Sequence, residues 1–181
     1  MRSSYSAGAM NALVKEHNIT GPFLLICGSG SVGTGAYYLA KQYKAIQDIW
    51  TKLASSKKLL DKRRFWKMLD VDYLVDDIIK KKVPLNKKEF YKSKTKYLMA
   101  LLNKNTGKVD YLDNQSSKSV SITEKIRAAL EMPIAFKMNP GVIIKGVTYC
   151  DSIASANSYV HIKKAVECGA EKILMIRYKN Y

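Results

Sequence analysis

The chain has 181 residues, 47% of them hydrophobic and 25% charged, a composition that supports one globular domain with a real core. Lysine and arginine number 31 against 15 acidic residues, and the resulting net charge of +16 attracts polyanions such as anionic membranes or nucleic acids. No apolar run approaches the roughly 20 residues of a membrane span, and no signal peptide is apparent. The cysteines Cys27, Cys150 and Cys168 form no closely spaced pair, which argues against a zinc site or a disulfide framework and favours a reducing compartment. We therefore expect a cytoplasmic protein that at most binds a membrane surface.

The first half of the chain predicts one buried strand among helices. The expected elements are a helix over 6–15, a strand over 23–27, a long helix over 34–54 and a strongly basic helical region over 55–94. The strand is an uninterrupted apolar run from Phe23 to Cys27, which is typical of a strand buried on both faces of a parallel sheet.

The second half predicts further strands that alternate with helices. The expected elements are strands over 97–102 and 109–112 joined by a turn, a helix from a capping box at Ser121 to about Glu131, strands over 134–136 and 142–149, a helix over 160–168 ended by Gly169, and a strand over 172–176. Strand and helix alternate at both ends of the chain, so we expect an α/β fold with a largely parallel sheet in a single domain over 1–181.

The segment from Cys27 to Gly33 carries the first candidate for chemistry. It predicts a strand, a sharp turn of small residues and a helix, which is the context that lifts a serine hydroxyl out of the backbone as a nucleophile. Ser31 is the preferred nucleophile because Gly33 follows two positions later, and Ser29 remains the alternative. Residues Ser29, Gly30 and Gly33 supply the small side chains that a strained turn needs. A phosphate-binding turn, or a tight turn with no chemical role, fits the same residues.

Four stretches in this order resemble the patatin-like phospholipases. They are 1–13, similar to the end of the glycine-rich oxyanion loop and its helix; 29–33, similar to the Gly-x-Ser-x-Gly elbow; 126–133, similar to the Arg-Ala-Ser…Pro segment; and 149–151 with 160–173, similar to the aspartate motif and the helix and strand after it. The sequence departs from the family at Ser29, which replaces the first elbow glycine, and at Ser152 and Ile153, which replace the glycines after the aspartate. At Met1 the family would still have its first strand and three glycines, so the resemblance implies a domain truncated within the oxyanion loop and incomplete at both ends.

The resemblance implies a three-layer sandwich, with a mainly parallel central sheet flanked by helices, that hydrolyses acyl esters of lipids without metal or organic cofactor. In the family's mechanism Ser31 would attack the ester carbonyl, and Asp151 would act as the general base of a Ser-Asp dyad. The Val32 amide would donate to the oxyanion, and Arg2 would support the oxyanion loop. Without the resemblance, Asp151 is an ordinary loop carboxylate.

Other features leave alternatives open. His161 is expected to be solvated and His17 to cap a helix end, so neither is assigned to a catalytic triad. The basic segment 57–67 fits either an interfacial helix on an anionic bilayer or a solvated helix face. Nucleic acid is a less favoured partner, because no recognition motif appears and the positive charge is spread along the chain. The rival to a lipid hydrolase is an inactive patatin-like fragment that binds a membrane or a protein partner through its basic surface.

Overall fold

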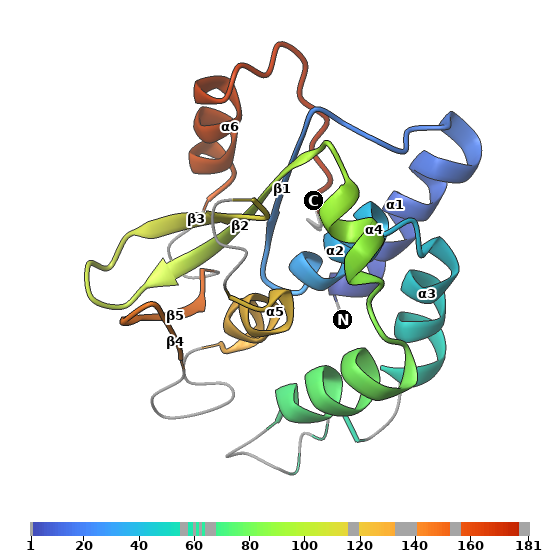
Figure 1. Cartoon of the computed structure of the whole chain (residues 1–181), viewed down its shortest axis with the longest axis vertical. Coiled ribbons are helices and arrows are strands. Elements are labelled where there is room, and N and C mark those ends of the chain that lie inside the picture. The colour runs from blue at the N-terminus through green and yellow to red at the C-terminus, as the bar shows by residue number, and fades with distance from the viewer. Residues whose placement is uncertain are drawn as a thin grey trace.

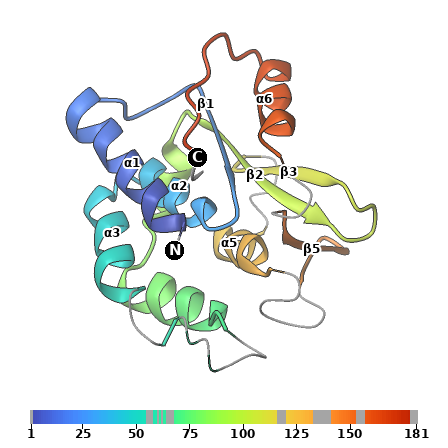
Figure 2. The same ribbon diagram turned by 180° about the vertical axis from the view of Figure 1, so that it is seen from behind.

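The computed structural model describes residues 2–54, 58, 59, 61, 63, 68–115, 120–132, 141–152 and 157–177. The elements in chain order are α1 (Arg2–His17), β1 (Leu24–Gly28), α2 (Ser31–Leu39), α3 (Tyr43–Asp48), the π-helical segments η1 (Ile49–Leu53) and η2 (Tyr73–Lys82), α4 (Lys87–Lys92), β2 (Lys96–Asn103), β3 (Val109–Asp113), α5 (Ile122–Leu130), β4 (Val142–Ile144), β5 (Val147–Asp151) and α6 (Ser158–Glu167). Helices α1 to α4 gather on one side of the molecule, and the β2–β3 hairpin projects from the other (Figure 1). Figure 2 shows the same arrangement from behind.

Strand β2 is the centre of the sheet because it has partners along both of its edges. β1 pairs with it in parallel over Lys96 to Ala100, and β5 pairs antiparallel over Leu101 to Asn103. β3 pairs antiparallel with Leu98 to Leu102, so it overlaps both of the other partners and must lie on the opposite edge. It follows that β1 and β5 lie end to end along one edge of β2. β4 then pairs antiparallel with β5.

The described sheet is mixed and mostly antiparallel, which corrects the expectation of a mainly parallel sheet. Only the β1–β2 pairing is parallel among the pairings of the described strands. The strand predicted over 142–149 is instead a hairpin, since Lys145 and Gly146 turn the chain with φ values of 50° and 80°. Residues 172–176 do not form a strand, and the strand predicted over 134–136 lies outside the described residues. The broader expectation of a mixed α/β chain is confirmed.

The single helix predicted over 34–54 is interrupted after α2. Lys41 has a φ of 56°, a left-handed conformation that no helix interior contains. The amides of Lys41 and Gln42 donate back to the carbonyls of Tyr38 and Tyr37, which closes α2 before α3 begins. The break lets the second half of the segment turn away and pack against α1. Apolar periodicity alone does not reveal such a break, because both halves keep a buried face.

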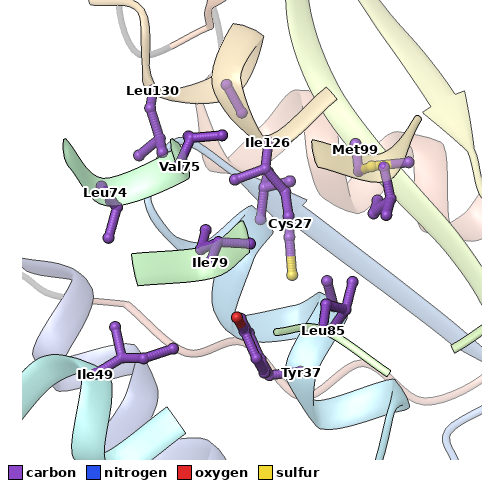
Figure 3. Packing of buried hydrophobic residues seen from close by; sticks show 14 of the residues in the cluster. Cys27, Tyr37, Ile49, Leu74, Val75, Ile79, Leu85, Met99, Ile126 and Leu130 are labelled. Carbon is purple, nitrogen blue, oxygen red and sulfur yellow. The ribbon is translucent and has the colours of Figure 1, made fainter. Parts of the chain in front are cut away.

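Helix α2 packs against β1 close to its neighbour β2, and its buried residues belong to the core (Figure 3). A Cβ at Gly35 would lie 2.8 Å from Cys27 Sγ and 2.9 Å from Tyr97 Oη, so only glycine permits this approach of helix to sheet. The buried Tyr97 hydroxyl donates to the Val32 carbonyl at 2.5 Å. This bond fixes the first turn of α2 over β2.

Helix α5 closes the other part of the core and carries an unusual lysine. Ser121 precedes the helix as predicted, but its Oγ accepts from the Thr123 amide at 3.4 Å and not from the Glu124 amide that a capping box would use. Lys125 is fully buried, and its Nζ donates to the Asp113 carbonyl at the end of β3 at 3.1 Å. Burial lowers the pKa of Lys125 from 10.5 to about 8. The lysine therefore links α5 to the far edge of β2.

Candidate active site

The turn between β1 and α2 holds a serine in a strained conformation. Ser29 follows the last residue of β1 and has a φ of 53°, and Ser31 is the first residue of α2. A serine with positive φ between a strand and a helix is the geometry of a nucleophile elbow. The strand continues one residue further than the apolar run predicts, so Ser29, not Ser31, is the residue at the apex.

The register of the sheet brings Asp151 to this turn from far along the sequence. Gly28 lies opposite Ala100 and Asp151 lies opposite Leu101, so β1 and β5 end at adjacent positions of β2. Ser29 Oγ donates to Asp151 Oδ2 at 2.7 Å. The carboxylate is fully buried, and the Asp151 amide donates to the Glu131 carbonyl at 3.0 Å, which anchors the end of β5 to the end of α5. The predicted meeting of a turn serine with Asp151 therefore occurs through Ser29.

Ser31 does not meet Asp151, which corrects the predicted pairing. Its Oγ donates to the Gly28 carbonyl at 2.7 Å and lies 3.2 Å from the Gly28 amide, which donates to it. The hydroxyl thus closes the turn from inside and stabilises its shape. The spacing to Gly33 favoured Ser31, but a Cβ at Gly33 would meet its nearest neighbour, Ile126 Cγ2, at an ordinary 3.8 Å. Gly33 is consequently not required by the packing.

The backbone amides that follow Ser29 stand at the start of α2. The Val32 amide, which the resemblance assigns to the oxyanion, donates to the Ser29 carbonyl at 3.0 Å within the turn. The residue after Ser29 is Gly30, whose amide stands at the amino end of α2, where the helix dipole favours negative charge. A Cβ at Gly30 would lie 1.9 Å from Ser3 Oγ, so the first turn of α1 packs directly on the elbow. Arg2 begins α1, but its side chain lies outside the described residues.

A cavity of about 910 Å³ opens beside β1 and reaches Ser29. Side chains of α1, β1 and α6 line it together with residues 169–177, and most of these side chains are apolar. Leu24, Leu25 and Ile26 contribute to its lining and are only half-buried, although the apolar run predicts a strand buried on both faces. The cavity explains the difference, because it occupies the side of β1 away from β2.

His161 also lines this cavity, where sequence reasoning had expected a solvated side chain. The imidazole is half-buried, and its Nδ1 lies 2.8 Å from the hydroxyl of Tyr111 on β3. Burial lowers its pKa, so the ring is neutral near pH 7. Its described partner is Tyr111, and no described hydrogen bond joins it to Ser29 or Asp151. His17 is the last residue of α1 and is exposed, in agreement with its expected place at a helix end.

The thiol nearest the elbow is not a competing nucleophile. Cys27 lies two residues before Ser29 and is 3% exposed. Burial raises its pKa from 9.0 to about 12, which leaves the thiol protonated at neutral pH. The hydroxyl of Ser29 differs from this thiol, because it donates a hydrogen bond to the carboxylate of Asp151, which can accept its proton.

Comparisons with known proteins add no assignment: no protein-family profile matches the chain, and no curated protein sequence matches it significantly. Among the described helices, none combines the length and apolar character needed to cross a membrane. Most of the basic segment 57–67, which fits either an interfacial helix or a solvated helix face, lies outside the described residues.

Proposed function

We propose that the chain is a serine acyl hydrolase of the patatin-like type, with Ser29 as the nucleophile and Asp151 as the general base. The observation that carries this proposal is the 2.7 Å hydrogen bond from Ser29 Oγ to Asp151 Oδ2 at a strand-to-helix turn. With Ser29 at the apex, the elbow reads Cys27-Gly28-Ser29-Gly30-Ser31, so the family's two outer glycines are replaced by Cys27 and Ser31. The serine of the motif remains. Gly30 follows it, and the close contact with Ser3 of α1 leaves no room for a side chain there.

The proposed reaction follows from the position of the two side chains. Ser29 Oγ attacks the carbonyl carbon of an ester while Asp151 takes its proton, and a tetrahedral oxyanion forms. Asp151 returns the proton to the oxygen of the leaving alcohol, and an acyl group remains on Ser29. Water activated by Asp151 then hydrolyses this acyl-enzyme and regenerates the serine. The Gly30 amide and the amino end of α2 are proposed to stabilise the oxyanion.

The proposed substrate class is an acyl ester of a lipid. The mostly apolar cavity beside Ser29 supports an apolar acyl group, and the net charge of +16 supports contact with an anionic lipid surface. A three-layer sandwich around the sheet, and a cytoplasmic place of action, belong to the same proposal.

A fluorophosphonate probe tests the proposal, because it forms a covalent adduct with an activated serine. We expect the adduct on Ser29, located by mass spectrometry of peptides, and no adduct in a Ser29→Ala variant. Asp151→Asn is expected to slow labelling by roughly 10²–10⁴-fold, since an amide cannot accept the serine proton.

Ser31→Ala is the matched control, since it removes a hydroxyl two residues away that bonds to Gly28 and not to Asp151. It should retain labelling at Ser29, with any loss small compared with that of Asp151→Asn. An adduct on Ser31, or no adduct on a chain whose fold is verified by circular dichroism, would contradict the proposed dyad.

A further inference from the structure

Strands β1 and β5 both end beside Ala100 of β2. The Lys96 amide donates to the Phe23 carbonyl, so Lys96 and every second residue after it turn their backbone groups towards the edge that β1 and β5 share. Ala100 is one of these residues. Strand β1 ends opposite it, and β5 ends opposite the next residue, Leu101. The two ladders therefore converge on the carbonyl of Ala100.

Neither ladder, over the residues that the structure describes, supplies the donor for this carbonyl. Continued by one residue, the parallel ladder would offer the Ser29 amide and the antiparallel ladder the Ser152 amide. Ser29 leaves the sheet with a φ of 53°, and in the described backbone hydrogen bonds neither amide reaches Ala100. The carbonyl accepts instead from Ser152 Oγ at 3.1 Å. The hydroxyl thus makes the bond that the two strands leave open.

The surroundings of Ser152 connect it to both strand ends. Ser152 is 2% exposed and Ala100 is fully buried, so a carbonyl left without a donor there would lower stability. A Cβ at Gly28 would lie 3.6 Å from Ser152 Oγ, so the hydroxyl also lies close to the last residue of β1. Asp151 directly precedes Ser152, and its Oδ2 accepts from Ser29 at 2.7 Å. One hydroxyl therefore lies between the two strand ends that carry Ser29 and Asp151.

We infer that Ser152 is a positioning residue for the proposed dyad. Its bond to Ala100 holds the end of β5 on β2, which keeps the Asp151 carboxylate within hydrogen-bond distance of Ser29. Ser152 itself takes no part in proton transfer, because its hydroxyl donates to a backbone carbonyl. Displacement of a general base by about 1 Å can slow a reaction by roughly 100-fold. The inference rests on the proposed function for the reaction, whereas the anchoring of the strand ends is measurable without it.

Amide hydrogen exchange of the full chain tests the anchoring. The amides of Asp151 and Val32 close the end of β5 and the elbow, each through a bond of 3.0 Å. In Ser152→Ala we expect both to exchange at least about tenfold faster than in the parent. The amides of Tyr97 and Asn103 bond on the other edge of β2, at 3.0 and 2.9 Å, and should keep their rates. Acceleration of all four amides by the same factor, or of none, would overturn the inference.

The fluorophosphonate reaction supplies a second readout, as labelling rates measured over a series of probe concentrations. We expect Ser152→Ala to lower the maximum labelling rate at Ser29 by roughly 10–100-fold and to leave the half-saturating probe concentration within about twofold. Tyr37→Phe is the matched control, because it also removes a buried hydroxyl that donates to a backbone carbonyl, that of Val83. This control should be labelled at the rate of the parent.

An unchanged maximum rate in Ser152→Ala would overturn the positioning role, even if exchange at the strand ends is faster, and so would an equal loss of rate in Tyr37→Phe. If the parent is not labelled at Ser29, the proposed hydrolase fails, and the exchange rates alone decide whether Ser152 anchors the two strands. If the alanine variant does not fold, Ser152→Cys takes its place, since a thiol is of similar size but is a weak hydrogen-bond donor.

Discussion

Strands β1 and β2 are both runs of apolar residues, yet they are buried to very different degrees. Tyr97, Met99 and Leu101 of β2 are completely buried. In β1, Cys27 is buried and the other four residues are half-buried. The two strands are neighbours; α2 packs against β1, α5 packs against β2, and Tyr97 of β2 also bonds to Val32 of α2. They differ in how many of their edges are paired. Strand β2 has described partner strands along both edges, whereas β1 has a described partner, β2, along one edge.

The comparison teaches that pairing determines how much of an apolar strand is buried. A strand with two neighbours also receives cover from the side chains of those neighbours, while a strand at an edge leaves one flank open. The elbow stands at the end of the half-paired strand, and its aspartate is brought in by β2. Ser29 and Asp151 therefore lie on the boundary between the tightly packed and the open part of the molecule.

The largest expected difference between the strands is in the cost of removing a leucine side chain. Leu101→Ala in β2 deletes a fully buried side chain and should lower the free energy of unfolding by about 2–5 kcal/mol. Leu24→Ala in β1 removes a half-buried side chain beside the cavity and should cost about 1 kcal/mol. Urea unfolding of both variants measures the difference. Equal losses would mean that β1 is as well covered in solution as β2.

A smaller loss of stability is expected where α2 approaches Cys27 of β1 and Tyr97 of β2. Gly35→Ala places a methyl group 2.8 Å from Cys27 Sγ, and we expect a loss of about 1–3 kcal/mol. Gly33→Ala, in the same helix, meets only an ordinary contact at 3.8 Å and should gain up to about 1 kcal/mol from helix propensity. Thermal unfolding of the pair gives the comparison. A Gly35→Ala variant as stable as the parent would show that helix and strand separate easily.

The last effect is confined to alkaline pH and concerns the far edge of β2, where Lys125 contacts the end of β3. Its pKa is about 8 in the folded chain against 10.5 for a free lysine, so between these values the unfolded state binds more protons and stability rises with pH. Relative to Lys125→Met, the parent should gain roughly 1 kcal/mol per pH unit in this window. Below about pH 7 both states carry the charged lysine, so the difference should be constant. Urea unfolding at a series of pH values measures it, and a difference that stays flat throughout would contradict the burial of the charge.

Local sequence signals predicted several elements closely. The apolar run at 23–27, the hairpin at 97–112 and the capped helix after Ser121 all correspond to observed elements, because each depends on neighbouring residues. The stop at Gly169 is also confirmed, with a φ of 88° just beyond α6. Left-handed turns at Lys41 and Lys145 were missed, since lysine carries no signal for that conformation.

The sequence predicted which two regions form the candidate site, but not which serine bonds to Asp151. The residues of the elbow and Asp151 stand out in the sequence, and the structure brings these two regions together. The choice between Ser29 and Ser31 depends on where β1 ends, which is determined by its pairing with Ala100. Likewise, the contact of His161 with Tyr111 joins residues 50 positions apart and has no local signature.

The left-handed backbone at Ser29 also limits which nucleophiles this turn can present. A φ of 53° is accessible to glycine and to side chains without branching at Cβ, and it is strongly disfavoured for threonine. Exchange of the hydroxyl for a thiol by Ser29→Cys preserves the backbone, whereas Ser29→Thr forces the turn to rearrange although both keep a nucleophilic atom. The conformation of this one residue thus disfavours threonine at this position, in evolution as in engineering, and leaves serine, cysteine and other side chains without a branch at Cβ.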